Sequence, residues 1–411
     1  MMSKQPKKKV VKATDPDAFM ANMTAAAEKK FGTKHMYAAS QHTQRYVGLP
    51  LPALALEYML RSNVLYLGSV YGLAGPPGSF KSSLGLEFAR IICAANGTGA
   101  LTETEGGKIS PDIVQSILGQ FSNRLTMKLV DNVEDAQAFM TFLVEWYQDK
   151  YPDKTQLYGF FLDSLFGSAG REKKDKIVKE GFAGRSFPVE ALLWSQWLQA
   201  FAPKFVGWPM IMVFVNHQKQ DIDSRFKGSY RHPGGDAQEF YATVYMHVKK
   251  IKVNEGADQR INHLEIRTVK HSFAPEDRRI NVPFVVDKLT EPPNLFFDWG
   301  HATADLLSDS KKCPNIADIV NVTMSTASMT ALTRTFSCKQ LGLKDVSGNV
   351  LGMAVHQNIE LMAQLRKALD IRIHDIWAGY MPAAISEKRE LAEGQHIVGN
   401  DAADANDALD F

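Results

Sequence analysis

The segment AGPPGSFKSSLGLEFA, residues 74–89, decides the fold. It follows the phosphate-binding pattern G-x-x-x-x-G-K-[ST], except that Phe80 occupies the position of the second glycine. An apolar run precedes it at residues 70–73, and apolar residues at helical spacing follow from Leu84. A strand, a loop and a helix in this order bind phosphate through backbone N–H groups and the helix N-terminus. The segment therefore predicts a nucleotide-binding α/β domain.

The side chains of this loop suit ATP with Mg²⁺. Lys81 is placed to reach the β- and γ-phosphates, and the hydroxyl of Ser82 to hold the metal. The apolar run LYGFFLDS ends at Asp163, which suits a second acidic group beside the metal. The residues predicted to bind ATP are Gly75, Pro76, Pro77, Gly78, Ser79, Phe80, Lys81, Ser82 and Ser83.

Short apolar runs alternate with amphipathic segments over residues 48–292, which predicts a mostly parallel sheet covered on both faces. Residues 1–47 combine a basic tail with an amphipathic helix between Asp15 and Gly32, for which we expect a role in oligomerisation. Residues 293–390 are expected to form a small helical domain, and residues 391–411 an acidic disordered tail. Within the helical part, the periodicity predicts one helix whose buried face carries Val355, Ile359, Met362 and Leu369.

Composition limits the class of protein. The net charge of +2 over 411 residues gives no global basicity, so any nucleic-acid surface must be local. No apolar run approaches the ~20 residues that span a bilayer. The cysteines lack metal-ligand spacing, which favours a reduced, cytoplasmic protein; they are Cys93, Cys313 and Cys338.

Two basic loops follow the apolar runs that end near Asp163 and His217, at the sheet edge where ligands bind in such folds. Residues 166–186 hold six lysines and arginines against three acids, and residues 218–235 interleave basic with aromatic side chains. This chemistry suits single-stranded DNA bound without sequence readout, although a solvated charged loop has the same composition. The predicted DNA-binding residues are Arg171, Lys173, Lys174, Lys176, Lys219, Arg225, Phe226, Lys227, Tyr230, Arg231, Gly234 and Gly235. Which aromatic side chain contacts DNA stays open.

These segments resemble the RecA-type recombinases over residues 48–290, and most closely the phage UvsX-type branch. The run Ser79-Phe80-Lys81-Ser82 is similar to the S-F-K-S of that branch, so the resemblance implies that Phe80 marks a subfamily. The run ETEGGKISP resembles the segment of the catalytic glutamate and implies that Glu105 activates the attacking water. Glu103 stays an alternative, because one residue more than usual separates Glu105 from Pro111.

The resemblance extends to four further segments. FLDSL matches the metal-side aspartate at Asp163, and NHQ matches the γ-phosphate sensor at His217, a histidine that carries no such meaning alone. GGDAQEFYA, residues 234–242, looks like the end of the second DNA-binding loop. VKHS implies that Lys270 contacts ATP on a neighbouring protomer, although Ser272 stands where RecA often has a second lysine.

The family implies a DNA-dependent ATPase that forms a head-to-tail helical filament on single-stranded DNA and pairs it with homologous duplex DNA. Such an activity serves recombination, repair and phage DNA replication in the host cytoplasm, with loader and single-strand-binding proteins as possible partners. One alternative is a hexameric RecA-core helicase, for which Arg267 is the candidate arginine finger and the fifty residues before the core leave no room for a collar domain. A non-catalytic DNA-binding filament protein is another, against which Lys81, Glu105 and Asp163 argue.

Overall fold

The computed structural model describes residues 23, 25, 26, 29, 30, 47–167, 169–180, 189–220, 230–231, 237–251, 260–287, 293–309, 316–324 and 334–380. The chain forms two units, Met1–Tyr46 and Val47–Phe411. The five described residues of the first unit are helical, within the segment where the sequence predicts a helix. All elements named below belong to the second unit.

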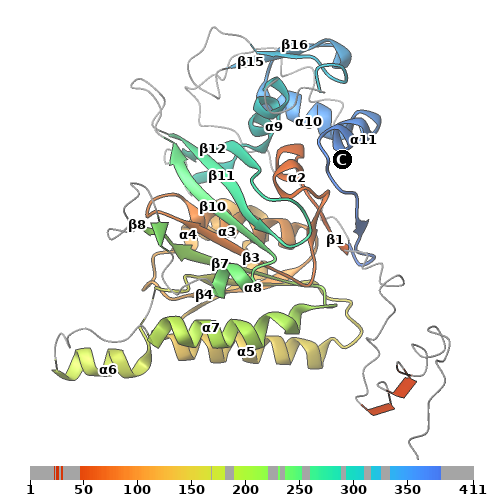
Figure 1. Cartoon of the computed structure of the whole chain (residues 1–411). Helices are drawn as coiled ribbons and strands as arrows, with labels where there is room; N and C mark the ends of the chain where they lie inside the picture. Colours follow the sequence, from red (N-terminus) through yellow and green to blue (C-terminus); the bar gives the residue numbers. More distant parts are fainter. Residues whose placement is uncertain are drawn as a thin grey trace, which may run out of the picture. The chain divides into compact units, whose positions relative to one another are not determined.

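Nine strands of the described chain form one sheet, in the order β13-β12-β11-β10-β3-β7-β6-β4-β5 (Figure 1). The six strands from β10 to β5 are parallel, and β11 to β13 extend the sheet in antiparallel fashion. This mostly parallel sheet confirms the predicted fold class. The parallel strands are β3 (Ser69–Gly75), β4 (Thr98–Glu103), β5 (Leu125–Leu129), β6 (Tyr158–Asp163), β7 (Met210–His217) and β10 (Val244–Ile251), and the others are β11 (Ile261–His271), β12 (Arg279–Asp287) and β13 (Asn294–Phe297).

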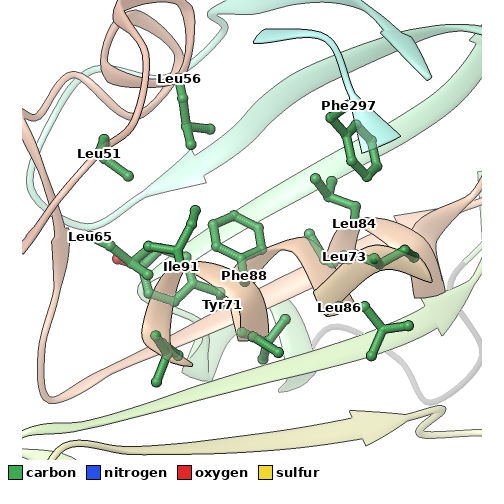
Figure 2. Close-up of a cluster of buried hydrophobic side chains, with 14 of the residues drawn as sticks. Leu51, Leu56, Leu65, Tyr71, Leu73, Leu84, Leu86, Phe88, Ile91 and Phe297 are labelled. Carbon is green, nitrogen blue, oxygen red and sulfur yellow. The ribbon is translucent and has the colours of Figure 1, made fainter. Parts of the chain in front are cut away.

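Helices cover both faces of the sheet, because its central strands are apolar on both sides. On one face, α3 (Lys81–Ala94) packs over Tyr71 and Leu73 of β3, and α4 (Pro111–Leu118) packs beside α3. Figure 2 shows the core between α3 and β3, in which Phe88 stacks on Tyr71. On the other face, α5 (Val133–Lys150) and α7 (Val189–Phe201) cover Val70 and Phe160. The strand β3 is thus buried along its whole length.

The C-terminal part has its own core, around Phe336, Leu351 and Leu365, to which α2 (Leu54–Leu60) contributes Leu54. Its helices are α9 (Trp299–Ser308), α10 (Gly348–Gln357) and α11 (Ile359–Ala368). A three-stranded sheet that the helical periodicity did not predict joins them; its strands are β14 (Val322–Met324), β15 (Thr335–Cys338) and β16 (Leu343–Ser347). The limits of the predicted domains stay predictions, and the acidic tail lies outside the described residues.

The prediction of a single helix through Val355 and Leu369 is wrong. The helix α10 ends at Gln357, and Asn358 starts α11 by accepting a hydrogen bond from Leu361 N at 3.0 Å. An asparagine side chain satisfies a backbone N–H that a new helix leaves open, so it favours a fresh start over continuation. Ile359, expected on the buried face, is consequently 84% exposed.

The C-terminal segment returns to the start of this unit. The strand β17 (Asp375–Ile376) pairs in parallel with β1 (Val47–Pro50), which pairs antiparallel with β2 (Val64–Tyr66). His374 N donates to Asn63 Oδ1 at 2.7 Å and so fixes the returning chain. No helix in the described part of the chain is both long enough and apolar enough to cross a membrane.

A buried ion pair joins the two ends of this unit. Glu57 of α2 is fully buried and accepts two hydrogen bonds from Arg366 of α11, from Nε at 2.7 Å and from Nη2 at 2.6 Å. A carboxylate without water needs such a partner, because desolvation of an unpaired charge costs several kcal/mol.

We expect Glu57→Gln to lower the free energy of unfolding by about 3 kcal/mol, because it leaves the Arg366 guanidinium partly buried without its counter-charge. The measurement is the shift of the urea or thermal midpoint. Glu145→Gln is the matched control, because its pair with Lys204 lies at the surface and should be worth less than about 1 kcal/mol. Equal effects of the two variants would contradict this interpretation.

Candidate nucleotide site and DNA-binding loops

The predicted phosphate loop lies at the centre of the sheet. It connects β3, which ends at Gly75, with α3, which begins at Lys81. A Cβ atom at Gly75 would lie 2.1 Å from Val248 O, so no other residue fits there without moving β10. Gly78 has φ +73°, a backbone conformation that favours glycine. The predicted strand–loop–helix arrangement is therefore present.

The ammonium group of Lys81 is held inside this loop. Its Nζ donates to Pro76 O at 2.8 Å and to Ser79 Oγ at 3.3 Å. Burial lowers the pKa of Lys81, and the nearby carboxylates of Asp163 and Glu105 act in the opposite direction. The lysine is thus fixed at the N-terminus of α3, where backbone N–H groups favour an anion.

Phe80, the unusual residue of the motif, has φ +59° and lies in the left-handed region. A side chain there costs about 1–2 kcal/mol relative to glycine. The ring packs against Phe284 of β12, with 4.9 Å between the centroids, and the ammonium of Lys250 lies 5.8 Å from its centroid. The phenylalanine therefore keeps the backbone shape that glycine would give and anchors the loop to the sheet.

The described residues fit Mg²⁺ at Asp163 and Ser82. Asp163 is buried at the end of β6 and is hydrogen-bonded to Ser82, while its Oδ2 has no hydrogen-bond partner in the described part of the chain. Burial raises the pKa of Asp163 to about 6. A buried carboxylate oxygen beside a hydroxyl, next to a loop for phosphates, suits a hard cation that prefers oxygen ligands. No cluster of three or more His, Cys, Asp or Glu side chains offers a competing metal site within the described ranges.

The geometry separates the two candidate glutamates. Glu103 is buried at the end of β4, and its carboxylate accepts hydrogen bonds from Glu105 N at 2.8 Å and Gly107 N at 2.6 Å. It therefore shapes the loop. Glu105 follows the strand and points to the predicted nucleotide side: its Oε1 accepts from Ser164 Oγ at 2.7 Å and contacts His217 Nε2. This arrangement favours Glu105 over Glu103 as the water-activating residue.

The ends of four strands bring these groups together. Glu103 lies opposite Asp163 in the pairing of β4 with β6, and His217 at the end of β7 lies opposite Gly75. The contact with His217 is the main cause that lowers the pKa of Glu105, with Lys108 and Ser164 acting in the same direction against burial. The sequence predicted no role for Ser164 or Lys108, because a serine or lysine next to a motif carries no pattern of its own.

A further contact that the sequence did not predict leads away from His217. The side chain of Asn216 accepts a hydrogen bond from His217 N at 2.8 Å and donates one to Gln238 Oε1. Gln238 lies on α8 (Ala237–Tyr241), which follows the predicted second DNA loop. The strand tip at the nucleotide site is thus linked to the end of that loop.

Lys270 lies on β11, and its ammonium donates to the carbonyl oxygens of Glu239, at 2.6 Å, and Phe240 at the end of α8. Its Nζ is 5.5 Å from the centroid of the Phe240 ring, which is itself 72% exposed. These contacts are within one chain, so the predicted contact with ATP on a neighbouring protomer stays a prediction.

The first basic loop contains a helix, α6 (Arg171–Glu180). Its basic side chains pair with acids of the same chain: Arg171 with Asp135, Lys173 with Glu190, Lys174 with Asp131, and Lys176 with Glu172. Glu134 also accepts from Arg171 N at 2.9 Å and so caps the helix start. The predicted DNA-binding side chains of this loop are therefore gathered beside the N-termini of α5 and α7.

The second basic loop is described only at its two ends. Lys219–Gln220 (β8) and Tyr230–Arg231 (β9) form a two-stranded hairpin, with Lys219 opposite Arg231. Arg225, Phe226, Lys227, Gly234 and Gly235 lie outside the described residues. Their roles stay predictions.

Comparison with known proteins found no matching family model. The chain is 23% identical to Protein RecA of Mycolicibacterium vanbaalenii over 290 residues, which cover 70% of the chain and 79% of that protein. It is 26% identical to Protein RecA of Paenarthrobacter aurescens over 267 residues, 64% of the chain and 73% of the relative. Protein RecA of Nocardia farcinica is 23% identical over 265 residues, 64% and 72% of the two chains. These similarities support membership of the RecA family.

The mostly parallel sheet and the loop at its centre are those of a RecA-like core. The named relatives are bacterial proteins, so they bear on the family and not on its phage branch. The resemblance of Phe80 to the UvsX-type loop therefore stays a prediction.

We expect Phe80→Ala to destabilise the RecA-like core more than Phe80→Gly. Both variants lose the ring packing on Phe284, but only alanine keeps the left-handed strain, so the two free energies of unfolding should differ by about 1 kcal/mol. Chemical denaturation of the three proteins measures the order. A glycine variant less stable than the alanine variant would contradict the strain argument.

We expect Asp163→Asn to raise the free energy of unfolding in the absence of nucleotide. The pKa of Asp163 is raised from 3.8 to about 6, so its ionised form is disfavoured in the folded state. At pH 7.5 the variant should gain up to about 3 kcal/mol, and the gain should shrink as the pH falls through 6 because Asp163 then takes up a proton. Thermal unfolding between pH 4 and 8 in EDTA tests this; Asp149→Asn, an exposed acid on α5, is the control and should show no such trend. A gain that does not depend on pH would contradict it.

Proposed function

We propose that the protein is an ATP-dependent DNA recombinase that forms a filament on single-stranded DNA and promotes homologous pairing and strand exchange. The observation that carries the proposal is the group at the carboxyl ends of β3, β4, β6 and β7: Lys81 and Ser82 beside Asp163, with Glu105 held by Ser164 and His217. This group combines phosphate binding, metal binding and a base in one place. The similarity to RecA proteins supports the same activity.

In the proposed ATPase cycle, the backbone of residues 75–83 and the ammonium of Lys81 bind the β- and γ-phosphates. Ser82 and Asp163 would hold Mg²⁺, which neutralises charge on the phosphates when it is bound. Glu105 accepts a proton from the attacking water, and Ser164 orients the carboxylate for this step. Lys270 completes the site of the neighbouring protomer, as the resemblance implies.

The proposed link between ATP and DNA runs through the strand tip of β7. His217 meets the γ-phosphate side, and Asn216 joins it to Gln238 on α8, which follows the second DNA loop. A change at the γ-phosphate can therefore shift α8 and the loop before it. Lys270, which binds the last carbonyls of α8, ties the neighbour's nucleotide to the same helix.

DNA contacts in this proposal come from α6 and from the second loop. Arg171, Lys174 and Lys176 of α6 are paired with exposed carboxylates; such pairs are worth little in water and are readily exchanged for DNA phosphates. Lys173 differs, because its partner Glu190 is buried. Binding should therefore weaken steeply with salt. In this proposal, base pairing between the two DNAs supplies the sequence specificity. The protein belongs to the UvsX-type branch and acts in the cytoplasm of the phage host. Loader and single-strand-binding proteins are its possible partners.

The helicase alternative needs an arginine finger that reaches a neighbour. Its candidate, Arg267, donates from Nε to Asp277 Oδ1 at 2.6 Å within its own chain, so the structure adds no argument for that role. The non-catalytic alternative differs from the recombinase in one respect, which is that ATP turnover would not be needed for activity.

The test is joint-molecule formation with purified protein, Mg²⁺-ATP, a labelled single strand and a homologous supercoiled plasmid. We expect joints with the homologous plasmid and none with a heterologous one. Lys81→Ala should lose both ATP turnover and joints, because the phosphates lose their main cation. Glu105→Gln should lower ATP turnover by about 10²–10⁴-fold and keep nucleotide binding, because only the base is removed.

Other outcomes favour the alternatives. Turnover stimulated by single-stranded DNA, with strand displacement and without joints, would favour the helicase. Joint formation and DNA binding by Glu105→Gln at the level of the unaltered protein would favour the non-catalytic filament protein.

A further inference from the structure

The loop between β4 and α4 is folded back on itself. The buried carboxylate of Glu103 holds Glu105 N and Gly107 N, at 2.8 and 2.6 Å. Gly106 and Gly107 follow with φ +78° and +84°, two consecutive left-handed conformations that glycine adopts without strain. The turn brings the next residue, Lys108, back against Glu105.

Lys108 Nζ donates to Glu105 Oε2 at 2.7 Å. The lysine side chain is 70% exposed, whereas Glu105 is only 11% exposed, so the ammonium closes the solvent side of a nearly buried carboxylate. Glu105, Asp163 and Glu103 together raise the pKa of Lys108, which places one cation before three carboxylates.

The two oxygens of Glu105 are held from different sides. Oε1 is bound by Ser164 and contacts His217, on the sheet side. Lys108 is the partner of Oε2 among the described residues. A terminal carboxylate rotates freely between broad, two-fold wells, so one fixed oxygen does not set the plane of the group. A second contact does.

We propose that Lys108 is a positioning residue for ATP hydrolysis, which fixes the carboxylate of Glu105 toward the attacking water. The proposal rests on the ATPase activity proposed above. Ser164 and Lys108 then hold the two different oxygens of the Glu105 carboxylate. The turn at Gly106 and Gly107 places the Lys108 ammonium for this contact. The repulsion between Glu105 and Asp163 is compensated at the same point.

The pair is expected to contribute little to folding, because the Lys108 ammonium is 70% exposed to water, and ion pairs that water reaches are worth about 0–1 kcal/mol. Its value lies in geometry, since a catalytic group displaced by about 1 Å can cost up to about 10²-fold in rate. Loss of Lys108 should therefore lower the rate of ATP turnover and leave both the free energy of unfolding and the nucleotide affinity nearly unchanged.

The experiment is steady-state ATP hydrolysis with saturating single-stranded DNA, together with nucleotide affinity by fluorescence titration. We expect Lys108→Ala to lower kcat by about 5–20-fold, with KM and nucleotide affinity changed less than about twofold. Lys108→Arg should recover most of the rate, because it restores a cation at the same place. The matched control is Lys204→Ala. Lys204 on η2 (Ala202–Phe205) also pairs with a glutamate, Glu145 of α5, at 2.9 Å. Its removal should leave kcat unchanged.

A double-mutant cycle tests whether Lys108 acts through Glu105. In the Glu105→Gln background, Lys108→Ala should reduce the residual rate by less than about twofold, because residues that act as a unit are not additive. Gly107→Ala, which strains the turn, should lower kcat in the same direction as Lys108→Ala.

Three results would overturn the proposal. A large rise in KM or a loss of nucleotide affinity in Lys108→Ala would make the lysine a nucleotide contact. An unchanged kcat would make the pair a surface feature only, and an undiminished effect in the Glu105→Gln background would make its action independent of the base. If the unaltered protein hydrolyses no ATP, both the proposed function and this inference fail. If it hydrolyses ATP and the Lys108 variants leave kcat unchanged, only this inference fails.

Discussion

Carboxylates of Glu103, Glu105 and Asp163 are concentrated at the ends of two neighbouring strands, and the rest of the site is organised around that charge. The register of β4 with β6 puts Glu103 opposite Asp163, in a buried edge where water cannot screen them. Each carboxylate is compensated differently. Backbone N–H groups satisfy Glu103, while Lys108, Ser164 and His217 satisfy Glu105.

Asp163 remains the least compensated of the three, because one of its oxygens has no hydrogen-bond partner in the described chain and burial raises its pKa to about 6. Such a group stores a cost that a divalent cation relieves when it binds. In the function proposed above, Mg²⁺ bound with ATP would relieve this cost. A strongly perturbed pKa of this kind is typical of functional sites.

The helix α3 connects that site with the C-terminal part of the chain. Lys81 and Ser82 begin the helix, and Glu87, one and a half turns later, accepts hydrogen bonds from Arg90 and from Trp299 Nε1 at 2.9 Å. Trp299 starts α9, which packs in the C-terminal core with α10. On the other side of the sheet, Asn216 and Gln238 lead to α8. The candidate nucleotide site is thus connected through α3 to α9, and through Asn216 to α8 at the end of the second loop.

The sequence by itself determined the mostly parallel core and the position of the phosphate loop, because fully apolar runs, a glycine-rich turn and helical periodicity are local properties of the chain. It also named Lys81 and Ser82, which belong to the loop motif, and Asp163, which ends a strand that the pattern predicts. It favoured Glu105 over Glu103 only through the resemblance, because the two are two residues apart and differ in what surrounds them: Glu103 is enclosed by its own loop, and Glu105 faces Ser164 and His217. It missed Lys108, and it took α10 and α11 for one helix where Asn358 begins a new one. Only the tertiary structure decided these points, because each depends on contacts between residues of different strands and loops or on a single side chain that overrides a continuous apolar pattern.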